Sequence, residues 1–276
     1  MSIAIVTDSS CQLSPEELDR CGAIVVPITI VIDDVELADG VDVTAASFYD
    51  RIGDGLRLST SQPSPGAFIS AWEQAARAGA TEIVSIHVGQ EHSGTLNSAR
   101  LAATHLDMAI TIIDSRTTSY GLGVVVVEVA ARIAATGSTE GIVEFADNLI
   151  RGIGTVFILQ DLRYVLKGGR MRQAQLPTGT KDIPVLGGVG GGYQLIGTGR
   201  TIDELVEQMA AALLAGEHQR HVAIAFAAPD TLEFTEKLEA LMHASELVET
   251  VRRYRMGPAI AVHTGPGTAG GFQWPA

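Results

Sequence analysis

A histidine and four hydroxyl-rich segments are the residues of this sequence best suited to chemistry. His263 follows the apolar run 259–262, which predicts a buried strand that ends at an imidazole and a turn. The hydroxyl-rich segments are residues 7–10 (Thr-Asp-Ser-Ser), 59–62 (Ser-Thr-Ser-Gln), 93–95 (Ser-Gly-Thr) and 114–115 (Asp-Ser). Three of them directly follow predicted parallel strands, and open α/β sheets bind ligands at the carboxyl ends of their strands. We therefore expect a polar point that holds a carboxylate inside a largely apolar protein.

The Ser93-Gly94-Thr95 segment is the strongest candidate for contact with an anion, because it also opens a predicted helix. A helix N-terminus exposes free N–H groups and the positive end of the helix dipole. Gly94 allows an anion to approach the backbone, and the hydroxyls of Ser93 and Thr60 add two donors. Serine and threonine at strand ends also serve as turn formers and helix caps, so a purely structural role stays open for each segment.

Enzyme motifs are largely absent from the sequence. It contains no Gly-x-Ser-x-Gly elbow and no Gly-Lys-Ser/Thr of a phosphate-binding loop. Residues 265–270 match Gly-x-Gly-x-x-Gly, but too little sequence follows them for the rest of a dinucleotide fold. The other histidines lack metal-ligand spacing, so we expect no metal and no catalytic residue. Two alternatives remain open: a lipid or ester hydrolase that uses Ser93 and His263, and a binding protein for another small carboxylic acid.

Composition limits the class of protein. The 276 residues are 46% apolar, which is ample for a core and allows one large or two ordinary domains. The net charge of −13 argues against binding nucleic acid or anionic membranes. Cys11 and Cys21 form no Cys-x-x-Cys pair, and we expect reduced thiols. No apolar stretch has the length of a membrane span, and the sequence opens without the basic start of a signal peptide, so we expect a cytoplasmic protein.

The elements that must position these residues follow from periodicity and capping signals. Up to residue 159, strands predicted over 3–6, 23–32, 82–88, 109–113 and 157–159 alternate with helices, which indicates a parallel sheet with covered faces. Later residues predict a turn at 167–170, a glycine-rich hairpin or linker over 179–199, helices from Thr201 and Asp230, and strands over 222–227 and 249–262. We predict an α/β fold of two α/β domains. Residues 1–165 form the N-terminal domain with its mainly parallel sheet, and residues 166–276 form a mixed C-terminal domain.

The motifs in their order along the chain resemble the DegV family of bacterial fatty-acid-binding proteins. The resemblance covers nearly the whole chain and has six parts. They are residues 6–10 (Val-Thr-Asp-Ser-Ser), 60–64 (Thr-Ser-Gln-Pro-Ser), 93–95, 114–115 followed by Gly121 and Gly123, 162–170 (Leu-Arg-Tyr-Val-Leu-Lys-Gly-Gly-Arg), and 263–267 (His-Thr-Gly-Pro-Gly). The run before Ser-Gly-Thr, residues 87–92, is longer and more polar than the family's usual one. Each motif alone is weak, but six in sequence are specific.

The resemblance implies a carrier of one long-chain fatty acid, buried between the two domains, with no cofactor. It implies that Ser93 and Thr60 hold the carboxylate beside Gly94 and His263, with Asp8, Ser9, Ser61, Thr95 and Ser115 in supporting loops. It further implies presentation of the acyl group to a separate ATP-dependent fatty acid kinase that makes an acyl phosphate, with Arg170 and Arg200 near the docking face. Burial of roughly fifteen methylenes, at about 0.8 kcal/mol each, supplies on the order of 12 kcal/mol before ordering costs, so few polar contacts are needed.

Overall fold

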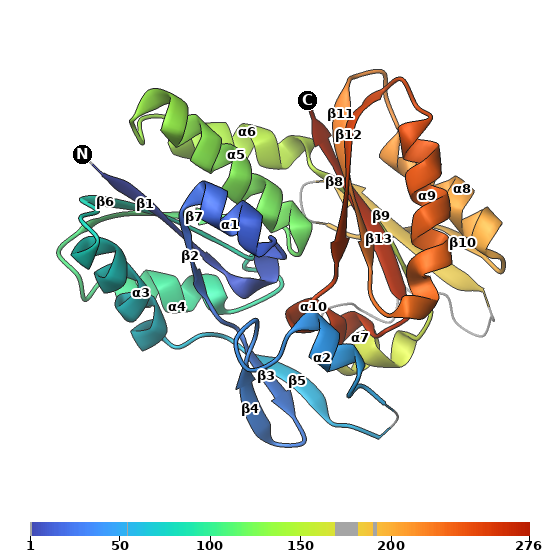
Figure 1. The fold of residues 1–276 in the computed structure, drawn as a ribbon, viewed down its shortest axis with the longest axis horizontal. Coiled ribbons are helices and arrows are strands. Elements are labelled where there is room, and N and C mark those ends of the chain that lie inside the picture. The colour runs from blue at the N-terminus through green and yellow to red at the C-terminus, as the bar shows by residue number, and fades with distance from the viewer. Residues whose placement is uncertain (1, 54, 169–181, 190–191) are drawn as a thin grey trace. The chain divides into compact units, whose positions relative to one another are not determined.

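The structure is a computed structural model that describes residues 2–53, 55–168, 182–189 and 192–276. The chain divides into two compact units. Unit 1 comprises residues 1–43 and 60–150, and unit 2 comprises residues 44–59 and 151–276. Each unit combines a sheet with helices, so the predicted α/β class is confirmed, with a parallel sheet first and a mixed sheet second (Figure 1).

Unit 1 contains a four-stranded parallel sheet in the order β2-β1-β6-β7. Its strands are β1 (Ile3–Asp8), β2 (Ala23–Val26), β6 (Glu82–His87) and β7 (Ala109–Asp114). The two central strands are almost continuously buried from their second or third residue onward, as expected for strands covered on both faces. The predicted strands at 3–6, 82–88 and 109–113 are confirmed.

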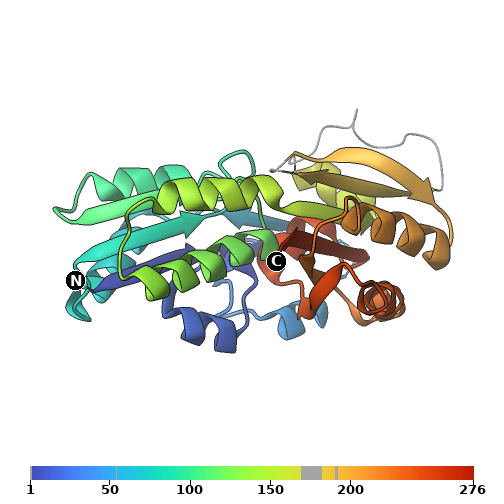
Figure 2. The same ribbon diagram turned by 90° about the horizontal axis from the view of Figure 1, so that it is seen from above.

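Helices cover both faces of this sheet (Figure 2). On one face, α3 (Pro65–Arg77) and α4 (Thr95–Ala103) enclose a core that includes Val6, Phe68 and Trp72. The helices α1 (Pro15–Cys21) and α5 (Tyr120–Thr136) contact β2, β1 and β6 from the other side. The last helix, α6 (Ile142–Gly152), ends where unit 2 resumes. The helix starts predicted at Ser14 and Ser64 are confirmed, since both serines cap their helices through side-chain hydrogen bonds.

Short elements follow the parallel strands of unit 1. The 3-10 helix η1 (Ser9–Cys11) follows β1, and a three-stranded sheet has the order β4-β3-β5. Its strands are β3 (Thr29–Ile32), β4 (Val35–Ala38) and β5 (Leu58–Ser61). The helix α2 (Ala45–Tyr49), capped by Thr44, lies between β4 and β5 in the chain. Thr60, predicted in a loop, therefore lies in a strand.

Unit 2 is built on a six-stranded mixed sheet in the order β10-β9-β8-β13-β11-β12. The strands are β8 (Gly154–Leu159), β9 (Ile183–Val189), β10 (Gln194–Gly199), β11 (Arg220–Phe226), β12 (Val248–Arg255) and β13 (Thr268–Pro275). Only β11 and β12 pair in parallel among these described strands. The antiparallel pair β9 and β10 confirms the predicted glycine-rich hairpin. β8 precedes residue 165, and it pairs within this sheet. The predicted boundary at 165/166 divides the chain into two domains, and that division stays a prediction.

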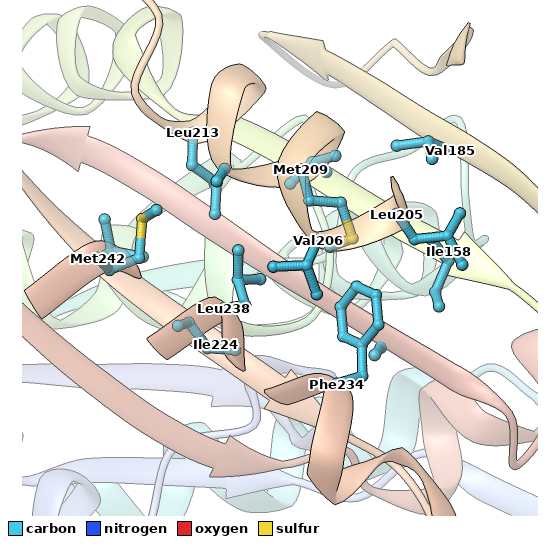
Figure 3. Close-up of a cluster of buried hydrophobic side chains, with 14 residues drawn as sticks. Ile158, Val185, Leu205, Val206, Met209, Leu213, Ile224, Phe234, Leu238 and Met242 are labelled. Atoms are coloured by element: carbon cyan, nitrogen blue, oxygen red, sulfur yellow. The ribbon is translucent and has the colours of Figure 1, made fainter. Parts of the chain in front are cut away.

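One face of this sheet carries the core of unit 2, beneath α8 (Ile202–Leu213) and α9 (Leu232–His243). Figure 3 shows Met209 of α8 and Phe234 of α9 among the side chains that fill this layer. Thr201 forms the predicted capping box with Glu204 at the start of α8. A 3-10 helix, η3 (Pro229–Thr231), precedes α9.

The strand predicted over residues 259–262 is wrong. These residues belong to the helix α10 (Pro258–Thr264), since Gly257 and Pro258 make a helix start and alanines favour the helix. The turn predicted after them is present at residues 266–267, and the strand β13, for which the sequence analysis makes no prediction, follows it at the centre of the sheet. Residues 162–168 likewise form a helix, α7 (Leu162–Gly168), rather than leading into a turn at 167.

Candidate functional site

The carboxyl ends of β1 and β6 mark the place in unit 1 where a ligand is expected. The chain passes from β1 to β2 on one side and from β6 to β7 on the other, so the sheet order reverses between β1 and β6. Open α/β sheets bind ligands in the crevice at such a switch point. The hydroxyl-rich segments after these two strands, residues 8–10 and 93–95, therefore flank the position that the topology favours (Figure 1).

Ser93 is held by its own loop. Its backbone N–H donates to the carbonyl of Gly89, 3.2 Å away. Its Oγ accepts the backbone N–H of Thr95 at 3.3 Å and lies 2.8 Å from the Thr95 Oγ1. Ser93 is half-buried and Thr95 is buried. If Thr95 donates both of these bonds, the proton of the Ser93 hydroxyl remains to be donated to an anion.

Gln62 joins the 60–62 segment to the start of α4. Its Nε2 donates to the Oγ of Ser98 at 3.0 Å, and its carboxamide lies against the Cα of Gly94. A Cβ at position 94 would overlap that carboxamide, so the present position of the Gln62 side chain depends on the glycine. Thr60 is half-buried at the end of β5, next to exposed Ser61. The structure thus brings the 60–62 and 93–95 segments together through Gln62 and Gly94.

Asp8 is the centre of a buried hydrogen-bond network. Its Oδ1 accepts the backbone N–H of Ser10 at 3.1 Å and the Ser10 hydroxyl at 2.5 Å. Its Oδ2 accepts the backbone N–H of Val88 at 3.0 Å and lies 3.2 Å from the Nδ1 of His87. The His87 Nε2 lies 2.7 Å from the Oγ of Ser85. Four donors match the acceptor capacity of one carboxylate, so Asp8 is saturated within unit 1.

Ser9 and Ser115 have hydrogen-bond partners within unit 1. The Oγ of Ser9 accepts the backbone N–H of Ile28 at 3.0 Å and so ties the segment after β1 to the start of β3. The hydroxyl of Ser115 is buried and donates to the carbonyl of Thr117 at 3.2 Å, a local bond typical of a turn former.

His263 lies in the last turn of α10, in unit 2, beside a pocket of about 270 Å³. The pocket is lined by the 53–59 segment, by α7 and by α10. The described lining residues are Gly53, Gly55, Leu56, Leu58, Ser59, Arg163, Tyr164, Lys167, Val262 and His263. Its wall is therefore mixed, with leucines and a valine next to an imidazole and two cationic side chains.

Packing between α7 and α10 places the helix that carries His263 against the other wall of this pocket. Gly265 has a φ of 84° and ends α10, and a Cβ there would lie 2.7 Å from the ring of Tyr164. At the start of α7, Asp161 accepts the backbone N–H of Arg163 at 3.0 Å and also binds its guanidinium. That guanidinium lowers the pKa of Asp161 below its usual range, so the carboxylate stays charged at the helix start.

Of the two predicted docking residues, only Arg200 lies within the part of the chain that the structure describes. Arg200 lies between β10 and α8, is highly exposed, and donates to the carboxylate of Asp182. Arg170 lies outside the described residues. Within the described ranges, no three His, Cys, Asp or Glu side chains gather as metal ligands. Every helix in the same ranges is too short or too polar to cross a membrane.

The sequence analysis assigns no role to His87, and it places Gln62 and the α7 residues only within motifs. His87 ends β6 just as Asp8 ends β1. Adjacent parallel strands bring their carboxyl ends together, so this shared position is the available signal. For Gln62 and Tyr164 the motifs at 60–64 and 162–170 are the local signal, whereas their fits against Gly94 and Gly265 depend on long-range packing.

Comparisons with known proteins agree with the fold. A family model described as "Uncharacterised protein, DegV family" matches residues 2–275. A DegV domain-containing protein of Staphylococcus aureus (strain MRSA252) is 31% identical over 278 residues, covering 96% of each chain. A solved structure entitled "Fatty Acid Binding of a DegV family Protein from Thermus thermophilus" is 28% identical with a TM-score of 0.92, and all of both chains is covered. A stearic acid-binding protein from Eubacterium ventriosum is 25% identical with a TM-score of 0.86, covering 100% of this chain and 98% of that one.

Proposed function

The chain belongs to the DegV family, and we propose that it binds a long-chain fatty acid and presents the carboxylate to an ATP-dependent kinase. The relatives of known structure support the first part, since those from Thermus thermophilus and Eubacterium ventriosum are described as binding fatty acids. In this proposal the protein is a carrier without cofactor or catalytic residue. Ser93, Thr60 and Gly94 of unit 1 receive the carboxylate, and His263 lines the pocket of unit 2.

The hydrogen bonding of Ser93 is the observation that carries the head-group assignment. Its Oγ can accept two bonds from Thr95, which leaves its proton directed to an acceptor outside the loop. A carboxylate is an acceptor only, so it complements this hydroxyl. A buried carboxylate needs all its acceptor positions met, and the N-terminus of α4 with Thr60 offers further donors.

The pocket at His263 supports an amphipathic ligand. Leu56, Leu58 and Val262 offer apolar contact, while His263 offers a donor to an oxygen. Apolar walls with a few polar groups are typical of sites that hold a small amphipathic molecule. A site for a short polar acid would instead need polar groups around the whole ligand.

Ester hydrolysis by Ser93 receives less support. A serine nucleophile needs a base that accepts its proton, and the Ser93 Oγ is bonded to Thr95, whose hydroxyl cannot serve as that base at neutral pH. The serine–imidazole pair formed by Ser85 and His87, 2.7 Å apart, is fully buried. Substrate therefore has no access to that pair in this conformation.

The head-group assignment is tested by the double substitution Thr60→Ala with Ser93→Ala. Loss of two donors to a charged oxygen costs about 1.5–3 kcal/mol each, so affinity for a fluorescent long-chain fatty acid falls by a factor of at least ten. The matched control is Thr104→Ala with Ser138→Ala, which removes two exposed hydroxyls of unit 1 that bond only neighbouring groups. Equal affinity of the double variant and the control, with both proteins folded, would contradict the assignment.

Carrier and enzyme are separated by the products that the protein forms. With a fatty acid kinase and ATP, hydroxylamine traps acyl phosphate as a hydroxamate, and the yield falls in the Thr60/Ser93 variant. The isolated protein leaves acyl esters intact. Ester turnover that disappears in Ser93→Ala would replace the carrier proposal with the hydrolase.

A further inference from the structure

We infer that Asp8 and His87 are positioning residues for the Ser93 loop and act on the ligand site through the backbone of residues 88–93. The inference rests on the proposed function, because it assigns a role to the loop that is proposed to receive the carboxylate. Its starting point is the network at the switch point, which the proposed function itself leaves unused.

The network bridges the two strands between which the sheet order reverses. Asp8 ends β1, and both His87 and Val88 lie at the end of β6. All three are buried, with Asp8 and His87 at 0% exposure. Because ligand loops diverge from this point, one carboxylate that binds both strand ends fixes the distance between the loops that follow them.

The polarity of the network follows from its first donor. The indole N–H of Trp72 donates to the Oγ of Ser85 at 3.2 Å. The Ser85 proton can then be donated to the Nε2 of His87, which leaves the His87 Nδ1–H for the carboxylate of Asp8. The ring centroids of His87 and Phe68 lie 5.0 Å apart in an edge-to-face arrangement, and this packing restricts the orientation of the imidazole. Asp8 is the charged group that faces it among the described contacts.

The path from Asp8 to Ser93 runs through two hydrogen bonds and the peptide bond between Val88 and Gly89. The Asp8 Oδ2 accepts the backbone N–H of Val88 at 3.0 Å. The carbonyl of the next residue, Gly89, accepts the backbone N–H of both His92 and Ser93, at 2.9 and 3.2 Å. Gly89 is also anchored on its other side, since its N–H donates to the carbonyl of Thr117 at 2.8 Å and it packs against the backbone of Arg116. Asp8 is therefore one of the anchors that set the position of the peptide to which Ser93 is bonded.

The substitution Asp8→Asn tests this role with little change in volume. The carboxamide replaces one acceptor by a donor, which must face either Ser10 or the Val88 and His87 N–H groups. We expect faster hydrogen exchange of the His92 and Ser93 amides, by about tenfold or more, together with roughly tenfold weaker binding of a fluorescent fatty acid. His87→Gln, which keeps the Asp8–Val88 bond, provides a milder second variant if Asp8→Asn folds poorly.

The control is Ile83→Val, a buried change on the same strand β6 that removes one methyl group and no hydrogen bond. This control is expected to lower the free energy of unfolding. It leaves the fatty acid affinity unchanged, and it also leaves unchanged the rate of exchange of the Ser93 amide once that rate is corrected for the change in global stability. Exchange at His92 and Ser93 that is equally unaffected in Asp8→Asn would overturn the inference.

A double-mutant cycle shows whether Asp8 acts through Ser93. In a Ser93→Ala background, Asp8→Asn is expected to weaken binding by much less than in the parent chain. The same loss in both backgrounds would overturn the inference. A Ser93→Ala variant that binds as tightly as the parent would instead contradict the proposed function, and amide exchange would still decide the positioning role.

Discussion

Ionisable side chains inside this chain are held by hydrogen bonds matched to their chemistry. Arg220, at 0% exposure, directs its guanidinium N–H groups to the carbonyls of Leu213, Ala215, Gly216 and His218, where α8 ends. These carbonyls have no partner within the helix, so the arginine acts as a buried C-terminal cap. Asp8 is the counterpart in unit 1, a carboxylate saturated by donors. Both side chains can be buried because hydrogen bonds within the protein satisfy their polar atoms.

Cys11 makes the alkaline stability of the protein depend on one thiol. Burial raises the pKa of Cys11 from 9.0 to about 12. Above pH 9 the unfolded chain releases this proton while the folded chain retains it, so stability is full below pH 9 and falls as the pH rises toward 12. The loss at pH 10 is on the order of 1 kcal/mol. Urea unfolding at pH 8 and pH 10 is expected to show this loss in the parent chain.

The control for this prediction is Cys11→Ala, in which the decline between the two pH values is smaller by about that amount. Burial also raises the pKa values of Tyr49 and Tyr193, but these groups are present in both proteins and so cancel in the comparison. An equal decline in both proteins would mean that Cys11 is reached by solvent.

Secondary-structure elements were predictable where their signals are local. The capping boxes at Ser14 and Thr201 involve residues three positions apart, so the sequence alone locates these helix starts. The run 259–262 carries no local signal that separates a strand from a helix, because four apolar residues are compatible with a buried strand or a short helix. The sequence predicts no element over β13, whose glycine pair at 270–271 gives no local strand signal, and pairing with β8 and β11 makes it a strand. The contact of Asp8 with His87 spans 79 positions, beyond any local pattern.

The start of α4 depends on the fit between Gly94 and Gln62. Gly94→Ala displaces the Gln62 carboxamide and breaks its bond to Ser98, which lowers the free energy of unfolding by about 1 kcal/mol. Gln62→Ala loses the same bond. Chemical denaturation of the two single variants and the double variant is expected to show a combined cost below the sum, since one bond is lost only once. Strict additivity would show that the two residues are independent.

At the scale of the whole molecule, the two units are not consecutive pieces of sequence. Unit 2 includes residues 44–59, which lie between two parts of unit 1 in the chain. Within unit 2 the guanidinium of Arg255 stacks on the ring of Tyr49 at 5.1 Å, and residues 53–59 line the pocket at His263. Nothing local in the sequence of residues 44–59 indicates that their contacts place them in unit 2.

This arrangement predicts the behaviour of fragments. Residues 151–276 alone lack residues 44–59, so they lose α2 with its cation–π contact and the part of the pocket wall that residues 53–59 supply. We expect this fragment to unfold at a lower urea concentration, followed by circular dichroism, than a fragment that also contains residues 44–59. A fragment in which residues 44–59 are joined to them by a glycine–serine linker is expected to regain stability. Equal midpoints for the two fragments would show that residues 44–59 contribute nothing to unit 2.

The central place of β13 also bears on how the protein is made. β8 and β11 are its neighbours in the sheet, yet roughly a hundred residues are translated between β8 and β13. At ribosomal rates of about 5–20 residues per second, β13 is synthesised on the order of ten seconds after β8. During that interval the nascent chain carries unpaired strand edges of the kind that invite aggregation. Unit 1 has its whole sheet available much earlier, so the two units face different demands for chaperone protection during biosynthesis.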